Sequence, residues 1–175
     1  MTGASGFAGS HLLQHLARDS FRLTAEAASE SMASGFSRTI DLVAWARSAP
    51  PAELAGLAQW DVVDLLDRDR VRQAIADLRP ARVFHCAGAA HVGDSWARTV
   101  DTLSANVLVT HYLFDAIRRA GIDCRLLVPG SAHVYAPSTQ PIAEDARLAP
   151  ASPYAISKLA QEQLGMQAVA HDGVK

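Results

Sequence analysis

Four short apolar runs divide the chain and predict buried strands. They cover residues 40–46, 61–65, 81–88 and 124–130, and each is bounded by turn-forming or charged residues. Runs of this length that lack a polar alternation are typical of strands covered on both faces. The chain is therefore expected to contain a buried sheet.

Helical periodicity fills the stretches between these runs. Apolar side chains recur three or four positions apart in residues 10–18, 71–78, 103–120 and 153–170. Residues 21–38 are rich in Ala, Ser and Glu and are interpreted as a surface excursion, helical in part. Strands that alternate with helices predict an α/β fold with a doubly wound parallel sheet.

The two ends of the chain do not fit a complete fold of this kind. Only Met1 precedes the glycine-rich turn at residues 2–9, where a buried strand is expected, and the chain stops at Lys175, one helix after the last run. We therefore expect one incomplete domain over residues 1–175, truncated at both ends, without its first strand and its C-terminal substrate lobe.

Composition narrows the function classes. The chain is 49% hydrophobic and 19% charged with a net charge of −2, so it is globular and carries no basic excess for nucleic acid or an acidic membrane. The arginines within residues 68–72 are interpreted as a solvated helix face. Cys86 and Cys124 are not paired in a CxxC motif, so no metal site is expected. No apolar span or signal peptide is visible, which favours a cytoplasmic protein.

The glycine-rich turn is the first candidate binding site. Gly3, Gly6 and Gly9 have the spacing G-x-x-G-x-x-G, with Phe7 and Ala8 between the last two. Glycine lets the backbone approach a pyrophosphate closely, and the N-terminus of the following helix favours its negative charge. These five residues are predicted to bind a dinucleotide, although a glycine turn alone is weak support.

Residues at the carboxyl ends of the predicted strands should face the same cofactor. Arg47 follows the first run, where no acid is present to bind the ribose of NAD, so NADP is favoured over NAD; a solvated strand end is the alternative. Asp64 and Leu65 are placed against the adenine, although Asp64 could equally cap a helix. Ala87 and Gly88 form the turn after the third run and are predicted to contact the cofactor.

Tyr154 and Lys158 are the main catalytic candidates. They lie four residues apart in S-P-Y-A-I-S-K and so share one helix face. An ammonium near a phenol favours the phenolate, which makes the tyrosine an acid/base for a carbonyl or alcohol. Ser131, after the fourth run, could hold the same substrate oxygen. Asn106 could hold a water or a backbone carbonyl nearby, or could be an exposed helix residue.

Two histidines complete the predicted substrate site. His133 follows Ser131 by two residues at the mouth of the expected cleft, and His91 follows the Ala87–Gly88 turn. A lone histidine is more often structural than catalytic, so a structural role is the alternative for both. The other histidines have no companions at a metal-ligand spacing.

These motifs together resemble the extended short-chain dehydrogenase/reductase family, also described as NAD-dependent epimerases and dehydratases. The resemblance rests on T-G-A-S-G-F-A-G, D-V-V-D-L, H-C-A-G-A-A-H-V-G-D-S, G-S-A-H-V-Y and P-Y-A-I-S-K and spans nearly the whole chain. It implies a Rossmann-type domain that binds NAD(P), a catalytic set of Ser131, Tyr154 and Lys158 supported by Asn106, and a homodimer formed through two helices per subunit.

Within the family, V-F-H-C-A-G-A-A-H-V-G-D-S-W, D-C-R-L-L-V-P-G-S and L-A-P-A-S-P-Y-A-I-S-K look closest to the GDP-mannose 4,6-dehydratases and the GDP-4-keto-6-deoxymannose reductases. His133 stands where those dehydratases carry Glu, which argues against dehydration. The expected function is NADP-dependent reduction of the 4-keto group of a GDP-6-deoxyhexose. The alternatives are a nucleotide-sugar 4-epimerase or 4,6-dehydratase, and an inactive fragment or a cofactor-binding regulator.

Overall fold

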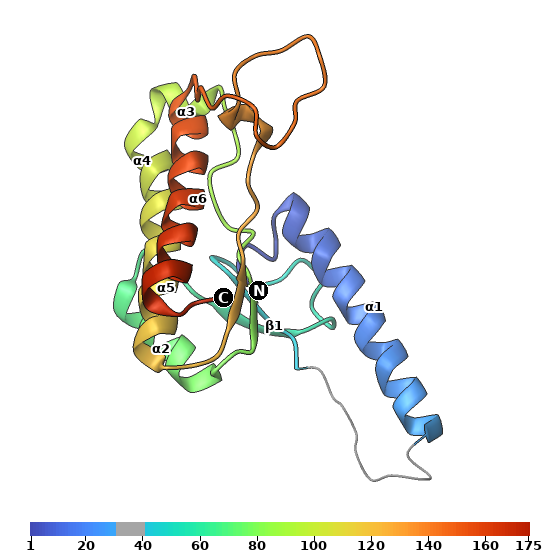
Figure 1. The fold of residues 1–175 in the computed structure, drawn as a ribbon. Coiled ribbons are helices and arrows are strands. Elements are labelled where there is room, and N and C mark those ends of the chain that lie inside the picture. The colour runs from blue at the N-terminus through green and yellow to red at the C-terminus, as the bar shows by residue number, and fades with distance from the viewer. Residues whose placement is uncertain (31–40) are drawn as a thin grey trace. The chain divides into compact units, whose positions relative to one another are not determined.

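The computed structural model describes residues 1–30 and 41–175, which fall into two compact units (Figure 1). The first unit comprises residues 1–63 and the second residues 64–175. The sequence predicts one incomplete domain over this length, and within it each unit has its own strands and helices. Among the described residues, no helix combines the length and the apolar character needed to cross a bilayer.

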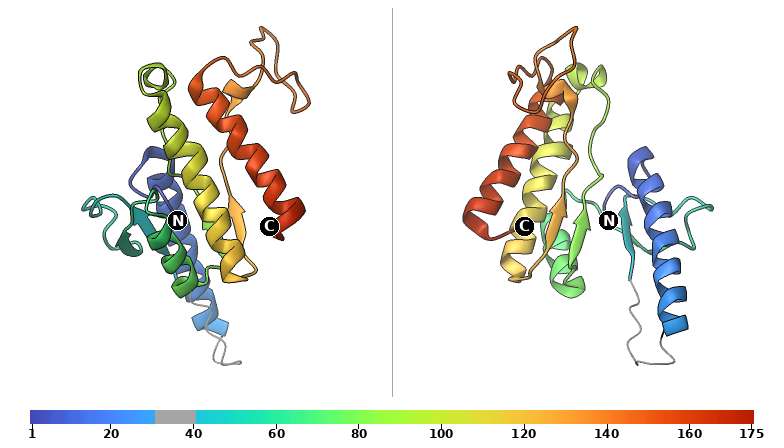
Figure 2. Two further views of the ribbon diagram at one scale, coloured as in Figure 1. Left: turned by 90° about the vertical axis from the view of Figure 1, so that its left-hand side faces the viewer. Right: turned by 45° about the vertical axis from the view of Figure 1, so that its right-hand side comes forward.

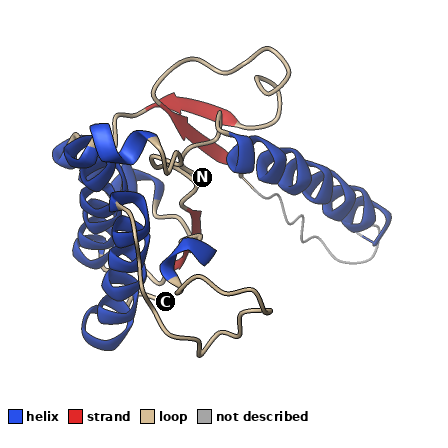
Figure 3. Cartoon of the chain, turned by 90° about the horizontal axis from the view of Figure 1, so that it is seen from above, coloured by secondary structure: helices blue, strands red, loops and turns tan. Residues whose placement is uncertain are grey.

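The first unit consists of helix α1 (Phe7–Glu30) and strands β1 (Val43–Ala46) and β2 (Gln59–Val62). The two strands are parallel, with Val43 opposite Gln59, and Figure 3 shows them side by side. Its core contains Ala4, Leu13, Ala44 and Leu54, each at most 2% exposed. The predicted helix and strands are therefore present, although β2 begins two residues before the predicted run.

The predicted surface excursion at residues 21–38 is helical up to Glu30, where α1 ends. The remainder, from residue 31, lies outside the described residues. The helical stripe predicted for residues 10–18 thus belongs to a longer helix than the sequence suggests.

The second unit also contains a parallel pair of strands, with helices beside it (Figure 2). In this pair Val83 lies opposite Leu126. Its elements are α2 (Arg68–Leu78), β3 (Arg82–Phe84), α3 (Asp94–Ala97), α4 (Thr99–Leu103), η1 (Ser104–Leu108), α5 (Val109–Ala120), β4 (Arg125–Leu127), η2 (Ala132–Val134) and α6 (Pro153–Asp172). Each strand pair is parallel, as the alternation of strands and helices predicts.

The ends of these helices follow from local sequence. Asp67 caps α2 by accepting the backbone N–H of Arg70, and Ser152 caps α6 by accepting that of Ala155, with Pro153 at the first helical position. Gly121 ends α5 in the left-handed conformation at φ +57°, where a side chain would be strained. Helix α5 therefore ends at Ala120, where the periodicity of residues 103–120 also ends.

The helix predicted for residues 103–120 is interrupted by a π-helical turn. Segments α4, η1 and α5 follow one another without a break in helical backbone, and η1 holds the π turn at Ser104–Leu108. A π turn accommodates an extra residue and changes the direction of the side chains in it. Asn106 lies in this turn.

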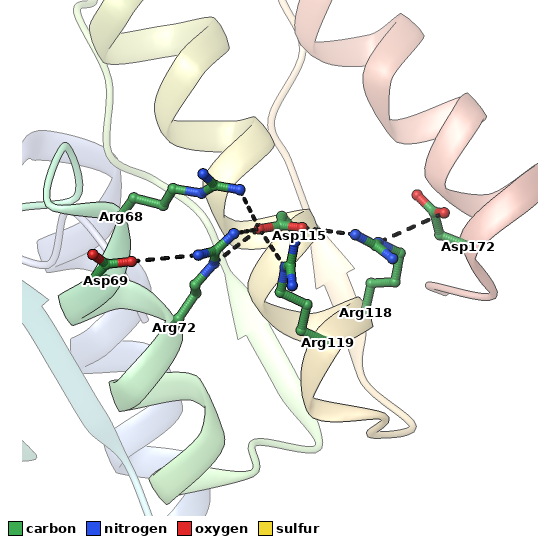
Figure 4. A network of polar contacts seen from close by, with 7 residues as sticks. All are labelled: Arg68, Asp69, Arg72, Asp115, Arg118, Arg119 and Asp172. Carbon is green, nitrogen blue, oxygen red and sulfur yellow. Dashed lines mark hydrogen bonds and ion pairs between the residues drawn. The ribbon is translucent and has the colours of Figure 1, made fainter.

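A buried carboxylate ties α2 to α5 (Figure 4). Asp115 is 6% exposed and accepts hydrogen bonds from two arginines of each helix, at distances of 2.7–3.3 Å. The interpretation of residues 68–72 as a solvated face is thus wrong for the half-buried Arg72, whose guanidinium group reaches across to α5, as does that of the exposed Arg68. The four donors are Arg68, Arg72, Arg118 and Arg119.

Candidate active site

The glycine-rich turn connects a residue paired with strand β1 to the start of helix α1. Thr2 forms a parallel bridge with Trp45 of β1, and the N–H of Gly6 donates to the carbonyl of Gly3 at 3.0 Å. Gly3 adopts a φ of +67°, which favours glycine. A Cβ on Gly9 would clash with the Gly3 carbonyl, so the first turn of α1 can pack against the glycine turn only without a side chain there.

This turn fits a phosphate-bearing cofactor. Helix α1 begins at Phe7, whose side chain is 86% exposed, and Ala8 beside it is also exposed. The first N–H groups of a helix have no partner within it, and together with the helix dipole they favour an anion. The close packing at Gly9 and the accessible helix start are what a dinucleotide pyrophosphate requires.

Arg47 lies directly after β1, with an exposed side chain. It occupies the carboxyl end of a parallel strand, where ligands bind in sheets of this kind. No carboxylate is present at residues 46–48. This position therefore carries an exposed cation and no acid.

The strand-end residues of the second unit differ in burial. The side chain of Asp64 accepts the N–H of Leu66 at 3.0 Å and caps a turn, whereas the cap of α2 is Asp67. Leu65 is 8% exposed and belongs to the core. The alternative interpretation of Asp64 as a helix cap is therefore wrong, and its exposed carboxylate remains a candidate for the adenine.

Asn106 is the centre of the best-defined polar arrangement. It is 1% exposed; its Oδ1 accepts the N–H of Ala89 at 2.7 Å, and its Nδ2 donates to the carbonyl of Ala89 at 3.1 Å and to Ser157 Oγ at 2.8 Å. Ser157 in turn donates to the carbonyl of Tyr154 at 2.7 Å. Asn106 is therefore no exposed helix residue, and it links the loop after β3 to the tyrosine turn of α6.

Gly88 makes this arrangement possible. Its φ is +156°, and a Cβ at this position would lie 2.6 Å from Asn106 Oδ1. Ala87 is half-buried beside it. The absence of a side chain at Gly88 thus leaves room for Asn106 to bond the backbone of Ala89. The sequence did not indicate this role for the Ala87–Gly88 turn.

Ser131, His133 and Tyr154 lie near one another at one end of α6. Ser131 is half-buried, and its Oγ accepts the backbone N–H of His133 at 3.3 Å, which caps η2. The ring of the exposed His133 contacts the half-buried Tyr154 ring edge-on, with centroids 6.0 Å apart. The structure thus connects Ser131 to Tyr154 through His133.

Lys158 follows Tyr154 by one helical turn and is half-buried. Its Nζ donates to Gln161 Oε1 at 2.7 Å. Burial lowers the pKa of the Lys158 ammonium, while Glu162 and Cys86 act in the opposite direction. Among the described residues, His91 is exposed and its side chain makes no hydrogen bond.

Several buried polar residues of this region were missed from the sequence. They fall within apolar helical stripes or strand runs, and the sequence does not single them out as site residues. Three of them lie on α5 or α6, whose packing against each other brings them together, and one follows β3. They are His85, Thr110, Ser157 and Gln161, each at most 2% exposed.

Comparison with known proteins identifies the family. The sequence matches the NAD dependent epimerase/dehydratase family over residues 1–175, the whole length of the chain. The chain belongs to this family. The predicted resemblance to extended short-chain dehydrogenases/reductases is thereby confirmed.

Three relatives illustrate the similarity. The UDP-glucose 4-epimerase of Azospirillum brasilense is 34% identical over 179 residues, covering 100% of this chain and 45% of that protein. The GDP-6-deoxy-D-mannose reductase of Pseudomonas aeruginosa is 36% identical over 107 residues, 59% of this chain and 35% of that protein. The solved UDP-glucose 4-epimerase of Thermus thermophilus, a complex with NAD, superposes with a TM-score of 0.73 at 26% identity, over 99% of this chain and 51% of that one.

These similarities confirm the predicted Rossmann-type α/β fold of the epimerase/dehydratase family. The chain spans about half the length of the relatives it matches. The GDP-linked branch expected from the sequence is represented by the shorter of the two sequence alignments, whereas the alignment over the whole chain is to a UDP-glucose 4-epimerase.

Proposed function

We propose that the protein carrying this chain is a nucleotide-sugar 4-epimerase that uses NAD. The observation that carries the proposal is the 34% identity to a UDP-glucose 4-epimerase along the entire chain. The geometry supports the same chemistry, because an acid/base tyrosine lies one helical turn from a half-buried ammonium. The GDP-linked reductase expected from the sequence becomes the second candidate.

The chain's residues would act on the C4 hydroxyl of the sugar. A bound nicotinamide would supply a hydride acceptor and, later, a hydride donor. Tyr154 takes the hydroxyl proton as the C4–H bond breaks and returns it to the same oxygen when hydride is added to the opposite face of the 4-keto sugar. Lys158, one helical turn from Tyr154, would orient the nicotinamide ribose, and Ser131 would hold the sugar oxygen. At the end of each cycle the tyrosine and the cofactor would be back in their starting states.

Asn106 would support this site without touching the sugar. It fixes the loop backbone at Ala89 and the tyrosine turn of α6 through Ser157. His133 offers an imidazole where dehydration would need a carboxylate, so we propose that 4,6-dehydration does not occur. The expected homodimer and the cytoplasmic location remain predictions.

NAD is proposed because the similar solved epimerase of Thermus thermophilus is a complex with NAD. Arg47 at the end of β1 keeps NADP as the alternative, since an arginine accommodates a 2′-phosphate. Calorimetric titration with both cofactors tests this: tighter NAD binding is expected. If NADP binds more tightly and Arg47→Ala removes the difference, the NADP preference expected from the sequence is correct.

Reduction of a GDP-linked 4-keto sugar is the second candidate, favoured by the 36% identity to the Pseudomonas reductase. The protein is incubated with UDP-glucose and with GDP-4-keto-6-deoxymannose, and both product and net cofactor oxidation are followed. An epimerase forms UDP-galactose without net consumption of cofactor. Stoichiometric oxidation of NADH or NADPH with the GDP sugar alone would replace the epimerase proposal by the reductase.

A further inference from the structure

A buried chain of hydrogen bonds leads away from the Lys158 ammonium into the helix pair α5–α6. Lys158 Nζ donates to Gln161 Oε1 at 2.7 Å, and Gln161 Nε2 donates to Thr110 Oγ1 at 2.6 Å. The Thr110 hydroxyl donates to the carbonyl of Asn106 at 2.6 Å, and His85 Nε2 lies 3.0 Å from the same hydroxyl. Gln161, Thr110 and His85 are each at most 2% exposed.

The directions of these bonds are fixed by the number of hydrogens. Thr110 has a single hydroxyl hydrogen, which the Asn106 carbonyl accepts, so its lone pairs must receive the Gln161 amide and the His85 ring N–H. His85 therefore carries a proton on Nε2. It is also neutral, because burial and the Lys158 ammonium lower its pKa to about 4.

The orientation of Gln161 follows. The NH₂ group of Gln161 donates to Thr110, so the other end of the amide, the acceptor Oε1, faces Lys158. This oxygen accepts a hydrogen bond from the Lys158 ammonium. A reversed amide would place two donors against Lys158 Nζ and an acceptor against a hydroxyl whose hydrogen is already used. The network thus sets the amide in the one state that binds a cation.

We propose that Gln161 is a positioning residue that holds the Lys158 ammonium, its amide locked by Thr110, His85 and the Asn106 carbonyl. The inference rests on the proposed function, in which Lys158 acts on Tyr154 and the cofactor. The same network reaches Asn106, whose side chain fixes the tyrosine turn. Gln161 therefore couples the placement of the lysine to that of the tyrosine.

Other titratable groups also act on Lys158. Glu162 on its own helix and Cys86 after β3 raise the pKa of Lys158, and neutral His85 faces it from the same end of β3. His133 of η2 packs against the Tyr154 ring. None of these residues is substituted in a variant series at Gln161, so the series changes only the acceptor that faces the ammonium.

The test is a titration of the lysine side chain in the protein carrying this chain, by NMR with ¹³Cε-labelled lysine. This chain contains only Lys158 and Lys175, and Lys158→Met assigns the signal. Gln161→Met removes the acceptor at nearly constant size and should lower the pKa of Lys158 by about one unit. Gln161→Glu supplies a charged acceptor and should raise it. Gln163→Met, the same change at an exposed position of α6, should leave it unaltered.

Turnover provides the functional readout. Gln161→Met should lower kcat about tenfold and shift the loss of activity at high pH to lower pH, because the ammonium is lost earlier. Gln161→Glu should shift that loss upward. Unchanged titration and pH profile in a folded Gln161→Met protein would overturn the proposal. The lysine titration needs no substrate, so it decides the proposal even if the protein is not an epimerase.

Discussion

Replacing Asp115 by asparagine tests the contact that holds the site-bearing helix α5 against α2. The change keeps the shape of the side chain and removes its charge. Asp115 is 6% exposed, and its four arginine donors are 26–52% exposed. Burial raises the pKa of Asp115, but the hydrogen bonds from Arg72, Arg119, Arg118 and Arg68 outweigh it and hold the pKa of that carboxyl well below its usual range.

The expected loss of stability is moderate because the arginines are partly solvated. One hydrogen bond to a charged group contributes about 1.5–3 kcal/mol, and exposed ion pairs contribute about 0–1 kcal/mol. Arg72 is the best-buried donor at 26% exposure and 2.7 Å, and the other three are screened. We therefore expect Asp115→Asn to lower the free energy of unfolding by about 2–3 kcal/mol at neutral pH.

The stability difference between the two proteins should depend on pH in one direction. The folded-state pKa of Asp115 is depressed, so its stabilisation is fully present above the unfolded-state pKa of about 3.9 and is lost as the pH falls through the folded-state value. Denaturant unfolding of both proteins from about pH 7 to about pH 3 should show a difference that shrinks below about pH 4.

Asp69→Asn is the matched control, since this carboxylate contacts the same Arg72 at 3.4 Å but is 91% exposed. It should cost at most about 0.5 kcal/mol. An Asp115→Asn protein as stable as the parent at neutral pH, or a difference that stays constant across the acid range, would refute the reasoning.

Two further substitutions test the site. Gly88→Ala should displace Asn106, because its Cβ would lie 2.6 Å from Oδ1, costing about 1–3 kcal/mol of stability and much of the activity. Gly93→Ala, with open space around it, should be neutral by thermal unfolding and assay. Tyr154→Phe should reduce turnover by about 10²–10⁴-fold while calorimetry shows intact cofactor binding. Near-normal turnover would show that Tyr154 is not the catalytic acid/base.

Local signals made much of the fold predictable. The glycine turn, the C-cap at Gly121 and the Tyr154 helix each depend on residues within one or two turns of one another, so their geometry can be inferred from spacing. Strand boundaries were less accurate, because β2 extends over Gln59 and Trp60, which no apolar run indicates.

The supporting residues of the site could not be predicted in the same way. Asn106 lies in a π turn and contacts Ala89 where Gly88 leaves room for its side chain, and neither feature is visible in helical periodicity. Gln161 and Thr110 are 51 residues apart and meet only when α5 and α6 pack. Polar residues buried by tertiary contact carry no local pattern.

The central claim is that hydride leaves C4 of the sugar and returns to it within one cycle. The most direct measurement uses UDP-glucose deuterated at C4 and analyses the 4-epimer by mass spectrometry and NMR. We predict UDP-galactose that retains deuterium at C4 and no net formation of reduced cofactor. Loss of the label to solvent, or its accumulation in released reduced cofactor, would contradict the proposed 4-epimerase.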